Sequence, residues 1–70
     1  MSFVVCLSNR GYRASLMVRR LYPVVPDPNA ESHRMLRVVD ESGEDYLYPE
    51  RMFGAVDLSR TVEKKLASAR

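Results

Sequence analysis

The chain has no tryptophan, one cysteine (Cys6) and one histidine (His33) among its 70 residues. A single cysteine excludes an internal disulfide, and one cysteine with one histidine cannot supply the four ligands of a structural zinc site. The lone cysteine is typical of a reducing compartment, so we expect a cytoplasmic protein. Without a disulfide or a zinc ion, the hydrophobic core has to stabilise the fold, and we expect no cofactor.

Long apolar runs are also absent. No segment approaches the roughly 20 apolar residues that a membrane-spanning helix needs. The run from Phe3 to Leu7 is too short for the hydrophobic part of a signal peptide, and no positive charge precedes it. We therefore expect no membrane partner.

A large excess of one charge is also missing. The formal net charge is +2, which is small for a nucleic-acid-binding domain.

Apolar residues make up 46% of the chain, which is ordinary for a globular protein and too many for a disordered one. The length allows one domain. Short β-branched and aromatic segments separated by turn residues predict a mainly β fold. The expected strands are 3–7, 20–25, 35–40, 45–48 and 53–58. We expect these five strands to close into a small barrel over residues 1–58, because closure removes exposed sheet edges.

The connections between these strands carry clear signals. A bend is expected at 15–19, although a helix through 15–25 is a rival interpretation that Pro23 and the β-branched residues disfavour. We expect one helical turn at 30–33 and a 3₁₀ turn at 49–52. The turn at 41–44 should place Gly43 in the left-handed conformation. Arg37 is expected to pair with acidic residues near this turn.

Residues 59–70 are predicted to form a short C-terminal helix or a frayed tail, with Ser59 or Asp57 as the cap. One stripe of the helix is apolar and contains Leu58, Val62, Leu66 and Ala69. This stripe could bind a partner or a second copy. The favoured interpretation is that the helix caps the open end of its own domain or frays.

Several motifs together resemble one group of proteins. Leu16, Arg20, Tyr22 and Val24 are followed by Val38, Asp40 and Gly43, and then by Tyr48, Pro49 and Phe53. This pattern resembles short uncharacterised bacterial proteins with SH3-like barrels, and the resemblance spans residues 3–58. It implies an SH3-like five-stranded small barrel. Eukaryotic SH3 domains bind proline-rich segments with an acidic first loop and a tryptophan, whereas residues 8–13 are basic here, so proline-motif binding is not predicted.

No arrangement in the sequence predicts an enzyme. Cys6 and His33 could form a thiol nucleophile with its base, but a cysteine between Val5 and Leu7 is more typical of a buried apolar residue. The acidic cluster Asp40, Glu41, Glu44 and Asp45 lacks the spacing of a calcium loop. We interpret it as a solvated turn.

Two candidate binding surfaces remain. The first is an aromatic patch for a protein partner, formed by Tyr12, Tyr46 and Tyr48. It requires Leu47 to point inward, and the alternative is that the tyrosines pack beneath the loops or the C-terminal helix. The second surface would bind nucleic acid through Arg10, Tyr12, Arg13, Arg19 and Arg20. A protein partner is the favoured hypothesis, nucleic acid is the alternative, and both a monomer and a weak homodimer are compatible with the sequence.

Overall fold

The computed structural model describes residues 2–68 of the chain. Its strands are β1 (Ser2–Cys6), β2 (Leu21–Val25), β3 (Met35–Val39), β4 (Asp45–Pro49) and β5 (Phe53–Ala55). Its helices are α1 (Pro28–Ser32), the 3₁₀ turn η1 (Glu50–Met52) and α2 (Arg60–Ser68). The mainly β fold with a C-terminal helix is therefore confirmed, and the helix through 15–25 is wrong.

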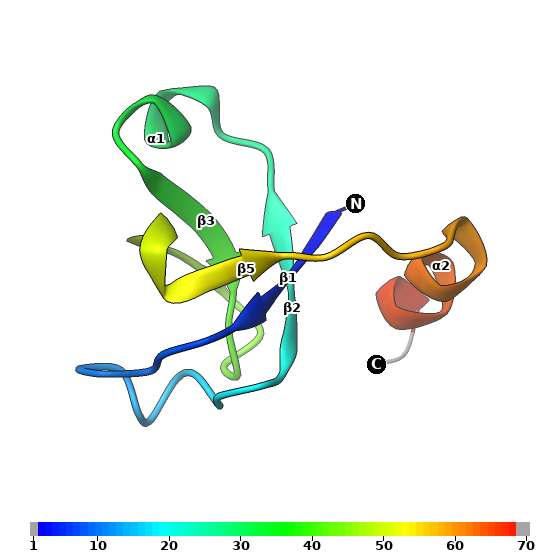
Figure 1. Ribbon diagram of the computed structural model, residues 1–70, viewed down its shortest axis with the longest axis horizontal. Coiled ribbons are helices and arrows are strands. Elements are labelled where there is room, and N and C mark those ends of the chain that lie inside the picture. Colours follow the sequence, from blue (N-terminus) through cyan, green and yellow to red (C-terminus); the bar gives the residue numbers. More distant parts are fainter. Residues whose placement is uncertain (1, 69–70) are drawn as a thin grey trace.

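All five strands form one antiparallel sheet in the order β4-β3-β2-β1-β5. The chain curls, so that β5 returns beside β1 (Figure 1). The predicted closure is not confirmed, because β4 and β5 do not pair and remain the two edges of the sheet within residues 2–68. Short strands limit how far a sheet can curl, and β5 is only 3 residues long.

Turn chemistry explains where the strands end. Gly43 has a φ of +83°, as predicted, and its N–H donates to the carbonyl of Asp40 to close the β3–β4 hairpin. Pro28 begins α1, where its missing N–H has no helical partner to lose. Asp27 caps this helix through a hydrogen bond from the backbone N–H of Ala30.

The hydrophobic core lies on one face of the sheet. It contains residues of all five strands together with two residues from the connections, namely Cys6, Leu16, Tyr22, Val24, Val38, Tyr48, Met52 and Phe53. Leu16 is fully buried although it belongs to the loop between β1 and β2. That loop therefore covers the core face, which is why a single small sheet can bury its apolar residues.

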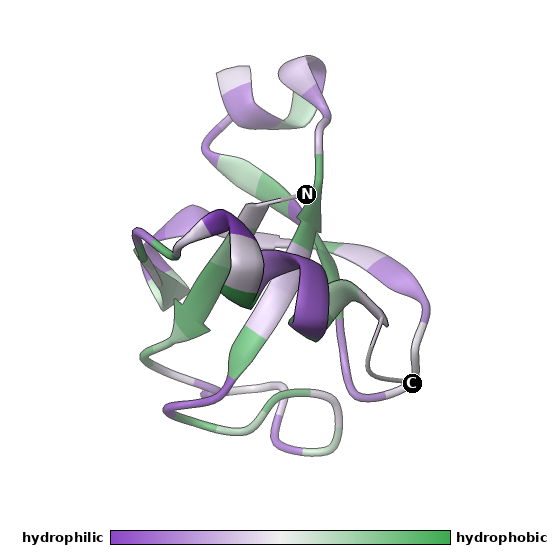
Figure 2. Cartoon of the chain, turned by 90° about the vertical axis from the view of Figure 1, so that its right-hand side faces the viewer, coloured by the Kyte–Doolittle hydropathy of each residue, from purple (hydrophilic) through white to green (hydrophobic). Residues whose placement is uncertain are grey.

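Helix α2 lies over the opposite face of the sheet (Figure 2). Ser59 caps it through a hydrogen bond from the N–H of Val62, which confirms one of the two predicted caps. Leu66 and Ala67 line a shallow hollow with Phe3 and Leu21 of the sheet. No residue of α2 is buried, however, so the helix packs only loosely against the sheet. Ala69, the last predicted member of the stripe, lies outside the described residues.

No helix within residues 2–68 combines the length and the apolar composition needed to cross a membrane.

Candidate interaction surface

Most candidate site residues belong to one segment, residues 7–20, which we call the β1–β2 loop. Backbone hydrogen bonds continue the β1–β2 pairing into the end of this loop. The N–H of Cys6 donates to the carbonyl of Arg20, and the N–H of Arg19 donates to the carbonyl of Cys6. The side-chain amide of Asn9 donates to the carbonyl of Leu16 over 3.0 Å and ties the middle of the loop. The loop is thus a folded ribbon with Leu16 as its anchor in the core.

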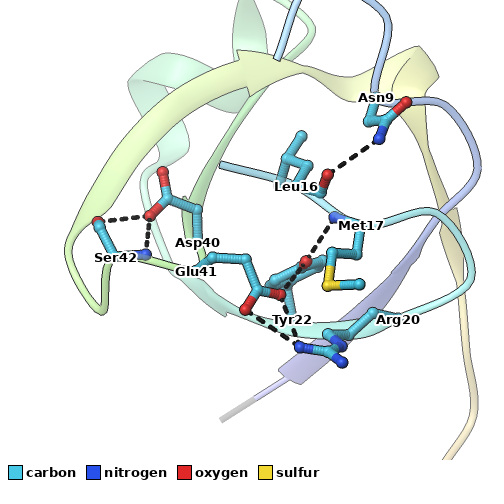
Figure 3. A network of polar contacts seen from close by, with 8 residues as sticks. All are labelled: Asn9, Leu16, Met17, Arg20, Tyr22, Asp40, Glu41 and Ser42. Carbon is cyan, nitrogen blue, oxygen red and sulfur yellow. Dashed lines mark hydrogen bonds and ion pairs between the residues drawn. The ribbon is translucent and has the colours of Figure 1, made fainter. Parts of the chain in front are cut away.

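A polar network fastens this loop to the β3–β4 hairpin (Figure 3). The Tyr22 hydroxyl donates to the Glu41 carboxylate and accepts a hydrogen bond of 2.7 Å from the backbone N–H of Met17. Arg20 Nη1 lies 3.1 Å from both oxygens of Glu41. Burial, reinforced by the hydrogen bond to Glu41, raises the pKa of Tyr22 to about 12.

A second attachment lies deeper. Asp40 is only 6% exposed and accepts hydrogen bonds from the backbone N–H of Ser42 and from the Tyr48 hydroxyl. Ser15 Oγ lies 3.0 Å from that hydroxyl, so the β1–β2 loop joins the network. Burial alone would raise the pKa of Asp40, but the hydrogen bonds from Ser42 and Tyr48 outweigh it and lower the pKa below its usual value. The carboxylate therefore stays ionised although it is buried.

Three of the four acids around the hairpin, Asp40, Glu41 and Asp45, bind neighbouring side chains, whereas Glu44 is exposed. Glu41 holds Arg20, and Asp45 lies 3.3 Å from Nη1 of Arg37, which confirms the expected pairing of Arg37 near the turn. Asp27 accepts a second bond from Arg37. Within residues 2–68, no three His, Cys, Asp or Glu side chains gather as metal ligands would.

The tyrosines separate into two environments. Tyr48 is 3% exposed, whereas Tyr12 is 41% and Tyr46 50% exposed. The rings of Tyr12 and Tyr48 meet edge to face with centroids 5.0 Å apart, and Tyr48 meets Phe53 in the same way. Leu47 is exposed, so the arrangement in which Leu47 points inward and Tyr48 lies on the surface is wrong. Tyr48 belongs to the core, and its ring packs against the ring of the exposed Tyr12.

The arginines separate as well. Arg20 is engaged by Glu41, whereas Arg10, Arg13 and Arg19 are exposed and form no ion pair within residues 2–68. Arg19 adopts a φ of +69°, which the hydrogen bond of its N–H to Cys6 maintains. Of the four arginines among the candidate nucleic-acid contacts, three are therefore free to meet a negatively charged group.

Cys6 and His33 do not form a catalytic pair. Cys6 is fully buried in β1, and its Sγ donates only to the carbonyl of Ser8. Burial raises the pKa of its thiol, which makes a thiolate scarce. His33 is exposed just after α1, with Nδ1 lying 2.8 Å from the carbonyl oxygen of Asn29. The arrangement matches a core cysteine and a surface histidine.

The structure also exposes apolar residues that the sequence did not single out. Leu7 is 58% exposed, Met17 49% and Val18 39%, and all three belong to the β1–β2 loop. Val18 lies in a turn within the bend expected at 15–19, and β2 begins only at Leu21. Neighbouring residues in the sequence do not reveal this exposure, because it depends on the orientation of the loop. That orientation is fixed where Leu16 packs into the core.

Comparison of the chain with protein families, curated proteins and solved structures finds no match.

Proposed function

We propose that this chain is a non-enzymatic protein-interaction module with an SH3-like architecture. Five short antiparallel strands, the return of β5 beside β1 and a 3₁₀ turn between β4 and β5 support the architecture that the motif resemblance implies. The absence of closure between β4 and β5 makes it an open variant of such a barrel. The long β1–β2 loop carries the binding surface.

The observation that carries this proposal is the position of Tyr12. Its ring is 41% exposed and yet rests edge to face on Tyr48, which is almost fully buried. An exposed aromatic ring on a rigid support loses little conformational entropy when a partner covers it. Tyrosine and arginine are also the residue types most enriched at the centres of protein interfaces.

The neighbours of Tyr12 along the loop indicate the chemistry of the partner. Arg10 and Arg13 flank it in sequence and are unpaired within the part of the chain that the structure describes. Met17 and Val18 add exposed apolar area on the same loop. We therefore expect an acidic protein segment that carries an apolar or aromatic side chain.

Selection from a random displayed-peptide library tests this proposal. Peptides rich in Asp or Glu with an aromatic or aliphatic residue should be enriched, and the Tyr12→Ala variant should bind them at least about tenfold more weakly. Val62→Ala is the matched control, because Val62 is 44% exposed but belongs to α2. An Arg10→Ala/Arg13→Ala double variant removes the charges without touching the Tyr48 support.

Two outcomes would overturn the proposal. One is a library that yields no peptide enriched over an unfolded variant of the chain. The other is a selected peptide whose affinity stays the same in both the Tyr12→Ala and the Arg10→Ala/Arg13→Ala proteins, with circular dichroism confirming that both variants are folded.

A second candidate function is weak binding of single-stranded nucleic acid, favoured by the same unpaired Arg10, Arg13 and Arg19 beside an exposed tyrosine. Phosphate contacts would make the affinity fall steeply with salt. Fluorescence anisotropy with a mixed-sequence oligonucleotide at two salt concentrations measures this. Binding that disappears in the Arg10→Ala/Arg13→Ala variant supports this candidate, and no salt-sensitive binding at micromolar protein removes it.

A further inference from the structure

The face of the sheet opposite the hydrophobic core carries a second, smaller group of apolar side chains. Strand alternation directs every second side chain of a strand away from the core. Four such outward side chains in β1, β2 and β3 are apolar, namely Phe3, Leu21, Pro23 and Val39, which we call the outer apolar group. Phe3 lies opposite Pro23 in the ladder and is only 5% exposed, although it does not belong to the core cluster. Its burial therefore arises on the outer face.

Helix α2 lies over this outer apolar group (Figure 2). Leu66 and Ala67 of the helix line a hollow of about 340 Å³ together with the four residues of the group. Leu66 is still 36% exposed, so its side chain does not fill the space beneath the helix. The helix and the sheet therefore meet across a partly open gap.

Polar contacts do not fasten α2 to the sheet. Within residues 2–68, the side chains of Ser59 and Ser68 bond only to backbone groups of the helix, and no ion pair involves a residue of α2. No backbone hydrogen bond joins residues 56–58 to another segment of this part of the chain. Apolar contact alone therefore holds the helix in place.

The position of this contact determines how α2 can open. Leu66 and Ala67 lie near the C-terminal end of the helix, whereas the chain enters it at the opposite end from residues 56–59. Loss of the contact at the far end therefore releases the whole helix and not a single turn. With 9 residues, α2 is too short to be stable in water by itself, so the released segment also loses its helical hydrogen bonds.

We infer that α2 is a hinged cover, which closes over the outer apolar group and opens as one unit while the sheet stays folded. Residues 56–59, which lead from β5 to α2, are the hinge (Figure 1). Opening exposes Phe3 and its neighbours but leaves the core on the other face intact. Elements with few buried contacts open in this way at a lower free energy than the whole fold. Tyr12 packs against Tyr48 on the core side, so the cover is independent of the proposed binding function.

Amide hydrogen exchange of the full chain, measured by NMR, tests this inference. We expect the amides of Lys64, Lys65 and Leu66 to share one protection factor, because a single opening event exposes all three. This factor should be at least about tenfold smaller than that of the ladder amides of β1, β2 and β3. Fraying would instead give protection that falls steadily from Lys64 towards Ser68.

Two substitutions should shift the opening equilibrium in opposite directions. Leu66→Asp replaces the apolar contact with a charge and should raise the exchange of the α2 amides nearly to the rate of an unfolded peptide, with the ladder amides unchanged. Ala67→Leu extends an apolar side chain into the hollow and should slow the exchange of the α2 amides at least about threefold. Ser68→Asp is the matched control, because it adds the same charge to α2 at a residue that does not line the hollow.

An apolar dye reports exposure of the outer face independently. Anilinonaphthalene sulfonate binds exposed apolar surface, and its fluorescence should rise at least about twofold in Leu66→Asp relative to Ser68→Asp. Equal fluorescence of these two variants would overturn the inference.

The exchange rates can also overturn it in three ways. The α2 amides of the wild type could be protected as strongly as the ladder, could exchange like an unfolded peptide, or could show the graded protection of fraying. A Leu66→Asp protein whose ladder amides accelerate as much as its α2 amides would have the same consequence, because α2 would then unfold only together with the sheet.

Discussion

The hydroxyl of Tyr48 donates a hydrogen bond of 2.6 Å to Oδ2 of Asp40, and this bond is buried between β4 and the residue that follows β3. The same hydroxyl lies against Ser15 of the β1–β2 loop. A buried carboxylate is tolerated only when hydrogen bonds compensate for its lost hydration. The Tyr48–Asp40 pair therefore links β4, the start of the β3–β4 turn and the β1–β2 loop, which are the three segments around the candidate surface.

Removal of the charge of Asp40 is expected to destabilise the fold. Asp40→Asn keeps the shape but offers only one acceptor oxygen to Ser42 and Tyr48, and we expect a loss of about 1–3 kcal/mol in the free energy of unfolding. Urea unfolding followed by circular dichroism measures it. Glu44→Gln is the control, because Glu44 is exposed on the same hairpin. Equal stabilities of the two variants would contradict this prediction.

Tyr46 and Tyr48 provide a matched pair on one strand. Tyr48→Phe removes the donor to Asp40 and should lower the free energy of unfolding by about 1–2 kcal/mol. Tyr46→Phe removes a hydroxyl from a ring that is 50% exposed and should change stability by less than about 0.5 kcal/mol. Thermal unfolding of both variants provides the measurement. A Tyr46 effect as large as that of Tyr48 would contradict the difference in burial between the two side chains.

The raised pKa of Tyr22 predicts loss of stability in alkaline solution. A phenol titrates near pH 10 in the unfolded chain and at about 12 in the folded protein. Its neutral form is thus favoured by folding, so the contribution is complete below about pH 10 and is lost as the pH rises towards 12, on the order of 2 kcal/mol. Tyr22→Phe should flatten the stability profile across this interval. An unchanged slope in that variant would assign the loss to Tyr48, whose pKa burial also raises.

Gly43 tests the hairpin through its backbone. Its φ is +83° and a Cβ would meet no atom within 4 Å, so any cost of Gly43→Ala arises from the conformation and not from a clash. We expect a destabilisation of about 1 kcal/mol, with Gly43→Asn costing less and Gly43→Val more. Chemical denaturation of the three variants gives the order. An alanine variant as stable as the wild type would contradict the left-handed turn.

Cys6 is predicted to be inert in the native state. Its thiol is fully buried and its pKa is raised by burial. Reaction with a disulfide reagent should therefore proceed only through unfolding and be slower by orders of magnitude than in urea, in proportion to the population of the open state. Absorbance of the released thiol measures both rates. A native rate close to the rate in urea would show that Cys6 is accessible.

Local chemistry determined most elements of the fold. Short β-branched and aromatic segments predicted the strands, Gly43 predicted the hairpin turn, and Ser59 was one of the two predicted caps of α2. Each of these features depends on residues within one turn or one strand. Strand boundaries shifted by no more than one residue, except in the last strand, which ends at Ala55 and not at Leu58. The burial of Cys6 also follows from its immediate neighbours.

Only the tertiary structure decided which candidate residues are exposed and unpaired. Tyr46 and Tyr48 share a strand face and cannot be distinguished by periodicity, yet the β1–β2 loop covers one and the sheet edge exposes the other. Arg20 and Arg10 are equally basic in the sequence, and only the approach of Glu41 separates the paired arginine from the free one. Exposure and ion pairing depend on groups that are distant in sequence, whereas strand and turn preferences are local properties of the chain.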